Sequence, residues 1–87
     1  MTGFELRCIR IFNQISQYQL AEELGYSTTD PIYKAERAEF LPHKFVKAIS
    51  KLVGIDFSNQ KTIDDYMKKL PKELGTKYLK PRYPSLF

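Results

Sequence analysis

The 87-residue chain contains one cysteine, one histidine and no tryptophan. A single thiol cannot form an internal disulfide, so a reducing compartment is expected. Cys8 is interpreted as a small buried residue of a helix. His43 has no second metal-type ligand at a recognisable spacing. These shortages exclude a disulfide scaffold and argue against a zinc module or any other metal or cofactor site.

Apolar residues nowhere approach the run of ~20 that a membrane span needs. The first residues carry no basic cluster followed by an apolar segment, so no signal peptide is expected. A glycine-rich phosphate loop and a catalytic triad pattern are both absent from the sequence. The neighbouring carboxylates Asp64 and Asp65 would point in different directions on a helix. We therefore expect a cytoplasmic protein that is not an enzyme.

Charge is divided unevenly along the chain. Residues 1–43 contain four basic and six acidic residues, a net charge of −2, whereas residues 44–87 contain ten basic and four acidic residues, a net charge of +6. The basic surface that a nucleic-acid partner requires is therefore expected mainly in the second half. The length suits one domain, and 43% hydrophobic with 28% charged residues is an ordinary globular composition.

Five helices are predicted from start and stop signals and from apolar residues that repeat with helical spacing. Two start signals are capping boxes, in which side chains three residues apart satisfy backbone N–H groups of the first turn. Glycine and proline supply the stops. The predicted helices are residues 3–13, capped by Thr2 and Glu5; residues 17–24, capped by Ser16 and Gln19 and closed by Gly25; a helix capped by Asp30 and opened by Pro31; residues 42–54, from Pro42 to Gly54; and a helix capped by Thr62 and ended by Pro71.

The apolar faces of these helices predict a single core and an all-α fold. Lys44, Lys47 and Lys51 form a separate basic stripe, which is either a plain solvated face or a contact surface for phosphates. The residues predicted to face inward are Phe4, Leu6, Ile9 and Phe12; Leu20, Ala21 and Leu24; Ile32 and Ala35; Phe45, Val46, Ile49, Leu52 and Val53; and Ile63, Tyr66, Met67 and Leu70.

The most informative stretch lies between Leu6 and Glu36. A small residue, Ala21, allows the following helix to approach closely, and Gly25 permits a sharp reversal of the chain. The most specific positions of this stretch are Ser16-Gln17, Leu20-Ala21, Leu24-Gly25 and Glu36. Through them the chain resembles the lambda-repressor-like (Cro-type, XRE-type) helix-turn-helix family over about residues 4–55. The resemblance implies a compact four- to five-helix DNA-binding domain at residues 1–57. Residues 58–87 would add a C-terminal helix and an extended arm to the same unit.

The same resemblance implies sequence-specific binding of double-stranded DNA by a transcriptional regulator, a repressor of the kind that phages and mobile elements encode. It implies that Arg10 and Glu36 form a structural ion pair that locks the recognition helix at its angle. The segment between Gly25 and Ile32 is one residue longer than the family spacing, and Ala38 replaces a common glycine, which allows this helix to continue toward Phe40. The residues implied to contact DNA are Gln17, Thr28, Thr29, Tyr33, Lys34 and Arg37. Because Glu36 and Glu39 cancel the charges of Lys34 and Arg37, Lys44 is added as a candidate phosphate contact on grounds of charge.

After Gly75 the two prolines at 81 and 84 favour an extended arm. Its basic residues are candidates for DNA contact, whereas its apolar end could pack on a second protomer in a homodimer that binds two half-sites. A protein-binding module that retains the fold, such as an antirepressor, an antitoxin or an inhibitor of host defence, is the alternative, supported by the acidic first half of the chain. The arm residues concerned are Lys77, Lys80 and Arg82 for DNA, and Leu86 and Phe87 for a protomer.

Overall fold

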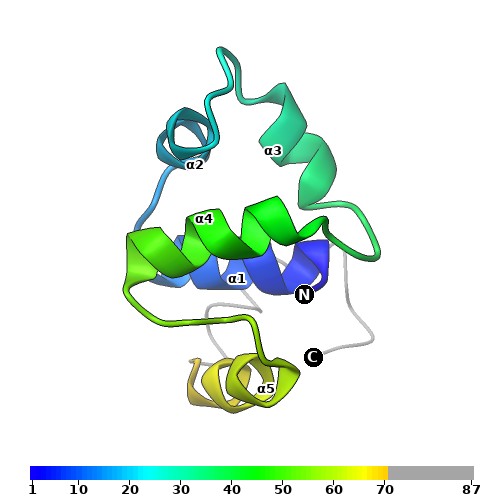
Figure 1. Cartoon of the computed structure of the whole chain (residues 1–87), viewed down its shortest axis with the longest axis vertical. Coiled ribbons are helices and arrows are strands. Elements are labelled where there is room, and N and C mark those ends of the chain that lie inside the picture. The colour runs from blue at the N-terminus through cyan, green and yellow to red at the C-terminus, as the bar shows by residue number, and fades with distance from the viewer. Residues whose placement is uncertain (71–87) are drawn as a thin grey trace.

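Residues 1–70, the part of the chain that the computed structural model describes, form a compact all-helical unit without strands, in agreement with the predicted fold class. Figure 1 shows α2 and α3 at one end of the molecule, α5 at the opposite end, and α1 and α4 between them. The predicted arm, with Lys77, Lys80 and Arg82, lies outside the described residues. The helices are α1 (Gly3–Phe12), α2 (Gln17–Glu23), α3 (Asp30–Ala35), α4 (His43–Val53) and α5 (Gln60–Lys69).

Both predicted capping boxes are present. The Thr2 hydroxyl accepts the Glu5 N–H at 3.1 Å, and the Glu5 carboxylate accepts the Thr2 N–H at 2.8 Å. Ser16 and Gln19 make the equivalent pair of bonds at the start of α2. These local bonds satisfy N–H groups that have no partner within the helix. They explain why both helices begin where the sequence predicts.

Three predicted helix signals are wrong. Asp30 does not cap α3 but is its first residue, and Thr29 in the capping position makes no side-chain bond. Asn59, not Thr62, caps α5, because its side chain accepts the Lys61 N–H at 2.8 Å and the helix starts two residues before Thr62. Helix α3 ends at Ala35 and does not continue toward Phe40. After Glu36 the backbone bonds change to the tighter i→i−3 spacing, with the Arg37 N–H donating to the Lys34 carbonyl and the Ala38 N–H to the Ala35 carbonyl.

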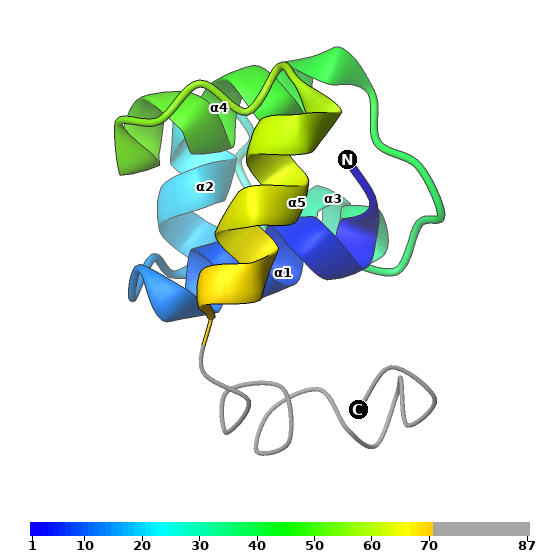
Figure 2. The same cartoon turned by 90° about the horizontal axis from the view of Figure 1, so that it is seen from below.

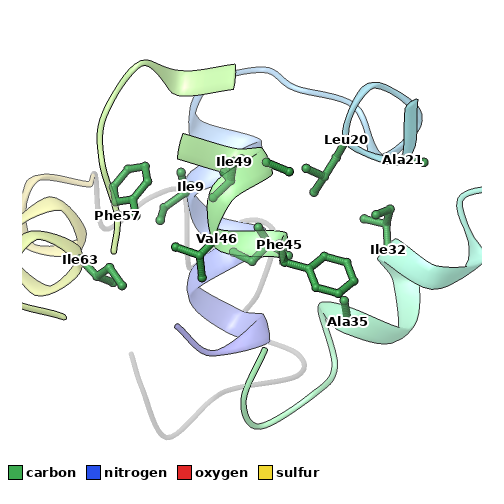
Figure 3. Packing of buried hydrophobic residues seen from close by; sticks show 12 residues of the cluster. Ile9, Leu20, Ala21, Ile32, Ala35, Phe45, Val46, Ile49, Phe57 and Ile63 are labelled. Carbon is green, nitrogen blue, oxygen red and sulfur yellow. The ribbon is translucent and has the colours of Figure 1, made fainter. Parts of the chain in front are cut away.

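Buried side chains from all five helices form one core cluster, which Figure 3 shows between the helices. Two residues predicted to face inward do not: the side chains of Phe12 and Leu52 are 43% and 36% exposed. Phe57, in the loop before α5, is fully buried and was not predicted to be in the core. The buried apolar residues are Leu6, Cys8, Ile9, Leu20, Ala21, Ile32, Ala35, Phe45, Val46, Ala48, Ile49, Phe57 and Ile63.

Helix α5 packs against α1, and Figure 2 shows the two helices crossing. Tyr66 of α5 makes edge-to-face ring contacts with Phe57 and Phe12, at centroid distances of 5.2 and 6.2 Å. The Tyr66 hydroxyl also accepts a 2.9 Å hydrogen bond from the Asn13 amide at the end of α1. Such aromatic pairs add about 0.5–1.5 kcal/mol each to the burial of their area.

The start of α1 lies directly against the segment that follows α3. Gly3 N–H donates to the Ala38 carbonyl at 3.0 Å. A Cβ atom at position 3 would lie 2.7 Å from that carbonyl oxygen and from the Glu36 carbonyl carbon, and would also collide with the Ala35 carbonyl. Only glycine therefore allows α1 to approach the end of α3 this closely.

We expect Gly3→Ala to destabilise the protein by about 1–3 kcal/mol, because the backbone atoms around the new methyl group must move. Alanine is the better helix former, so propensity alone predicts a gain of about 1 kcal/mol. Urea denaturation followed by circular dichroism distinguishes the two signs. An increase in stability would contradict the close approach of these two segments.

Candidate nucleic-acid interface

A buried ion pair joins α1 to the end of α3. The Glu36 side chain is fully buried, and Arg10 is 9% exposed. Arg10 donates from Nε to Oε2 at 2.5 Å and from Nη2 to Oε1 at 3.1 Å, a two-point contact, and its Nη1 donates to the Ile15 carbonyl at 2.9 Å. The two residues predicted to pair are therefore in contact. The guanidinium also holds the turn that leads into α2.

Two further side chains converge on the same carboxylate. Arg7 Nη1 lies 3.4 Å from Glu36 Oε1, and the Gln17 amide donates to that oxygen at 3.1 Å. The network therefore links α1, the first residue of α2 and the residue after α3. Gln17 was predicted as a DNA contact, and here its amide N–H group faces inward. We refer to Arg7, Arg10, Gln17 and Glu36 as the Glu36 network.

Helix α3 has one buried and one exposed side. Ile32 and Ala35 are buried against the core, as predicted. Tyr33 and Lys34 of the helix are exposed, and so is Arg37, which lies two residues after the end of the helix. A helix of six residues is only about 9 Å long, so these three side chains form one small outer surface. We call these three residues the α3 face.

Arg37 is held in place within the α3 face. Its guanidinium carbon lies 3.4 Å from the centre of the Tyr33 ring, and its Nη1 lies 3.5 Å from the Tyr33 carbonyl oxygen. Stacking on an aromatic ring stabilises the guanidinium by about 0.5–1 kcal/mol at an exposed site. Arg37 also borders a hollow of about 500 Å³ beside the start of α1 and Met67 of α5. The stacked pair therefore occupies the C-terminal end of the α3 face.

The other predicted contact residues lie around the opposite end of α3. Thr28 is exposed and Thr29 is half-buried in the turn that precedes the helix. Lys44, in the first turn of α4, places its Nζ 5.2 Å from the centre of the Tyr26 ring in the α2–α3 turn. The turn between α2 and α3 therefore contains Thr28 and Thr29, and Lys44 contacts its Tyr26 ring.

A scan against models of protein families, a search of curated proteins and a search of solved structures each found no match. The site is therefore assigned from its own geometry and chemistry.

The three lysines of the predicted stripe on α4 lie in two different surroundings. Lys44 lies over Tyr26, whereas Lys47 and Lys51 line a groove between α4 and residues 54–58. Lys51 also forms a 3.2 Å ion pair with Glu23 of α2. Only the first lysine of the stripe is thus placed near the α2–α3 turn.

Metal-ligating side chains and the single thiol are the next features of residues 1–70. Within residues 1–70, no group of three or more His, Cys, Asp or Glu side chains could hold a metal ion. Burial raises the pKa of the Cys8 thiol to about 12, so almost no nucleophilic thiolate forms at neutral pH. No helix within the same residues has the length and apolar character that crossing a membrane requires.

Proposed function

We propose that this protein binds double-stranded DNA sequence-specifically as a transcriptional regulator, with α2 and α3 acting as a helix-turn-helix of the lambda-repressor-like kind. The observation that carries the proposal is the α3 face: Tyr33 and Lys34 of α3 and Arg37, two residues after it, are exposed, while the opposite side of the helix is buried. The major groove of B-DNA admits an α-helix and displays base edges that Lys and Arg can bind. Helix α3 is then the recognition helix.

The Glu36 network supports this role because it fixes the angle at which α3 is presented. Glu36 is the first residue after α3, and both arginines that bind it come from α1. The fold thus presents the α3 face from a preformed support, with little ordering left to occur on binding. Gln17, bound to the same carboxylate, couples the start of α2 to the recognition helix.

The first turn of α4 also favours an anionic partner. His43 and Lys44 stand there, no acidic residue accompanies them, and Pro42 in the capping position provides no side-chain hydrogen bond. The dipole of a helix is positive at this end, so basic side chains are unfavourable there. A DNA phosphate beside Lys44 would relieve this repulsion and replace the missing cap.

In this proposal Lys34 and the stacked Tyr33–Arg37 pair contact base edges in the groove. Thr28, Thr29 and Lys44 bind phosphates on either side. The protein acts without a cofactor and without catalysis, as a repressor that occludes a promoter. Binding as a homodimer to two half-sites about one helical turn apart would give a palindromic operator.

We expect Lys34→Ala to weaken binding to the preferred duplex by about 1–3 kcal/mol, because a base contact is lost. The preferred duplex comes from selection out of a random pool at two salt concentrations, and affinity is then measured by fluorescence anisotropy. Lys68→Ala, which removes an exposed lysine from α5 at the other end of the molecule, is the matched control.

Lys44→Ala separates a phosphate contact from a base contact. It should weaken binding to all duplexes alike and reduce the slope of log affinity against log salt by about 1. The proposal fails if no duplex binds at low salt. It also fails if Lys34→Ala and Lys68→Ala bind the selected duplex equally well.

A second candidate is a protein-binding module, favoured by the hollow beside Arg37. Carboxylates of Glu5 and Glu39 border this hollow together with the apolar side chain of Met67. Carboxylates next to the α3 face repel phosphates, whereas a protein partner with basic and apolar groups would match them. This function predicts a complex with a protein that survives high salt, together with an absence of duplex binding at low salt.

A further inference from the structure

The hollow beside Arg37 differs from the α3 face in both shape and lining. Its volume of about 500 Å³ is in the range of clefts that hold small ligands, so it suits a few side chains and not a folded domain. It lies between the start of α1, the segment after α3 and the last turn of α5. The half-buried side chains of Phe4 and Met67 make part of its lining apolar.

The hollow carries more negative than positive charge. The carboxylates of Glu5 and Glu39 border it together with one cation, Arg37, whose guanidinium is stacked on the Tyr33 ring. Among residues 1–70, neither carboxylate forms an ion pair with a basic side chain. An occupant that matches this hollow therefore combines apolar side chains with positive charge.

The chain itself contains a segment of this composition. Residues 77–83 read Lys-Tyr-Leu-Lys-Pro-Arg-Tyr, with three cations, no anion and three large apolar or aromatic residues. They lie outside the described residues, but the chain leads toward them from the edge of the hollow, because the Leu70 N–H donates to the carbonyl of Met67 at 3.2 Å. Residues 71–76 separate Leu70 from the segment, and six residues can span about 20 Å. The segment is thus attached within reach of the hollow.

We propose that residues 77–83 dock in this hollow of their own chain, with their apolar side chains against Phe4 and Met67 and their cations beside Glu5 and Glu39. A segment on a short tether acts at an effective concentration on the order of millimolar, so a weak interaction is enough to occupy the site. A second copy or another protein lacks this advantage at micromolar concentration. DNA is disfavoured as the occupant, because the two carboxylates repel phosphates.

Docking would change the surroundings of the α3 face. Cations beside Glu5 and Glu39 offset the two carboxylates that border Arg37, so the charge next to the α3 face becomes less negative. A basic and apolar protein partner would have to displace the segment before it could bind in the hollow. The docking itself does not rest on the proposed function.

A spin label placed just after the segment tests the proposal on the full chain without DNA. Ser85→Cys provides the attachment site, and Cys8 stays unlabelled because it is 2% exposed and its pKa of about 12 leaves almost no thiolate. In NMR spectra the label should broaden the amide signals of Glu39 and Met67 far more than that of Glu22 on α2, which lies at the other end of the molecule from α5. Isotope-labelled chains without the spin label, mixed with spin-labelled chains, should show no broadening.

Two variants of the spin-labelled chain test the charged and the apolar contacts separately. Glu39→Lys replaces an attraction with a repulsion and should shift the equilibrium toward the undocked form about fivefold, which weakens the broadening at Met67. Tyr78→Ser/Leu79→Ser should weaken the same broadening, because apolar burial is lost. Glu22→Lys, the same charge change at an exposed position of α2, is the matched control and should leave the broadening as in the parent chain.

Three results would overturn the proposal. Broadening that passes between chains would identify a second copy as the occupant. Equal broadening of the Glu22 and Met67 signals would show that the segment does not dock, and equal losses in Glu22→Lys and Glu39→Lys would show that the hollow does not attract it. Because these samples contain no DNA, such results leave the proposed function untouched, and a failure of duplex binding leaves the docking untouched.

Discussion

Replacing Glu36 with alanine is expected to lower the free energy of unfolding by about 3–5 kcal/mol, because removing one partner of a buried ion pair leaves the other charge uncompensated. Arg10 is 9% exposed and would lose both bonds to the carboxylate. Arg7 and Gln17 would lose an acceptor as well. Small domains have a total stability of only about 5–15 kcal/mol, so the variant should be largely unfolded in mild urea.

Glu39→Ala is the matched control, since it removes an exposed carboxylate three residues further along the chain. Its effect should stay within about 0.5 kcal/mol. The double variant Arg10→Met/Glu36→Leu replaces the charged pair with apolar groups of similar size and should be more stable than Glu36→Ala alone. Equal stability losses in Glu36→Ala and Glu39→Ala would show that the network contributes little to the fold.

Helix positions were predictable from the sequence because their signals are local. The Thr2–Glu5 and Ser16–Gln19 boxes operate within one helical turn, so the residues that specify each helix start lie next to one another in the chain. Gly25 and Gly54 follow the same logic, because each takes a positive φ at the end of a helix. Four adjacent residues are enough to recognise either signal.

The features that the sequence did not reveal depend on tertiary contacts. Gln14 has a φ of 57° in the turn after α1, a conformation that usually favours glycine, and no residue type at that position signals it. The turn is held instead by Arg10, whose backbone carbonyl accepts the Ile15 N–H and whose side chain binds the Ile15 carbonyl. Helix α3 likewise ends early, at Ala35, immediately before the buried Glu36.

The candidate interface was predictable only in part. The contact between Arg10 and Glu36 spans 26 residues and followed from the family resemblance, not from spacing. Arg7 was missed, although it lies three residues before Arg10 and so shares its face of α1. The stacking of Arg37 on Tyr33 joins residues four apart, as the sequence predicted, although Arg37 lies two residues after the end of α3. That Gln17 turns its amide toward Glu36 depends on how α1, α2 and α3 are packed, which spacing does not specify.

Phe57 provides the second large effect that we expect, because it attaches α5 to the rest of the core. It lies outside every helix, yet it is fully buried and contacts the Tyr66 ring of α5. Its backbone N–H donates to Ser50 Oγ on α4 at 3.0 Å. Phe57→Ala should therefore destabilise the protein by about 3–5 kcal/mol, through lost burial and a cavity between α4 and α5.

Phe40→Ala makes the same chemical change at a residue that is 74% exposed, and it should alter stability by no more than about 0.5 kcal/mol. Thermal and urea unfolding of the two variants, followed by circular dichroism, provide the comparison. If α5 were only loosely attached, Phe57→Ala would remove helical signal from the native state but leave the main unfolding transition in place. A single transition shifted to lower urea would instead show that α5 and the four preceding helices unfold as one cooperative unit. The packing of α5, at the opposite end of the molecule, would then contribute to the stability of the helices that hold the α3 face.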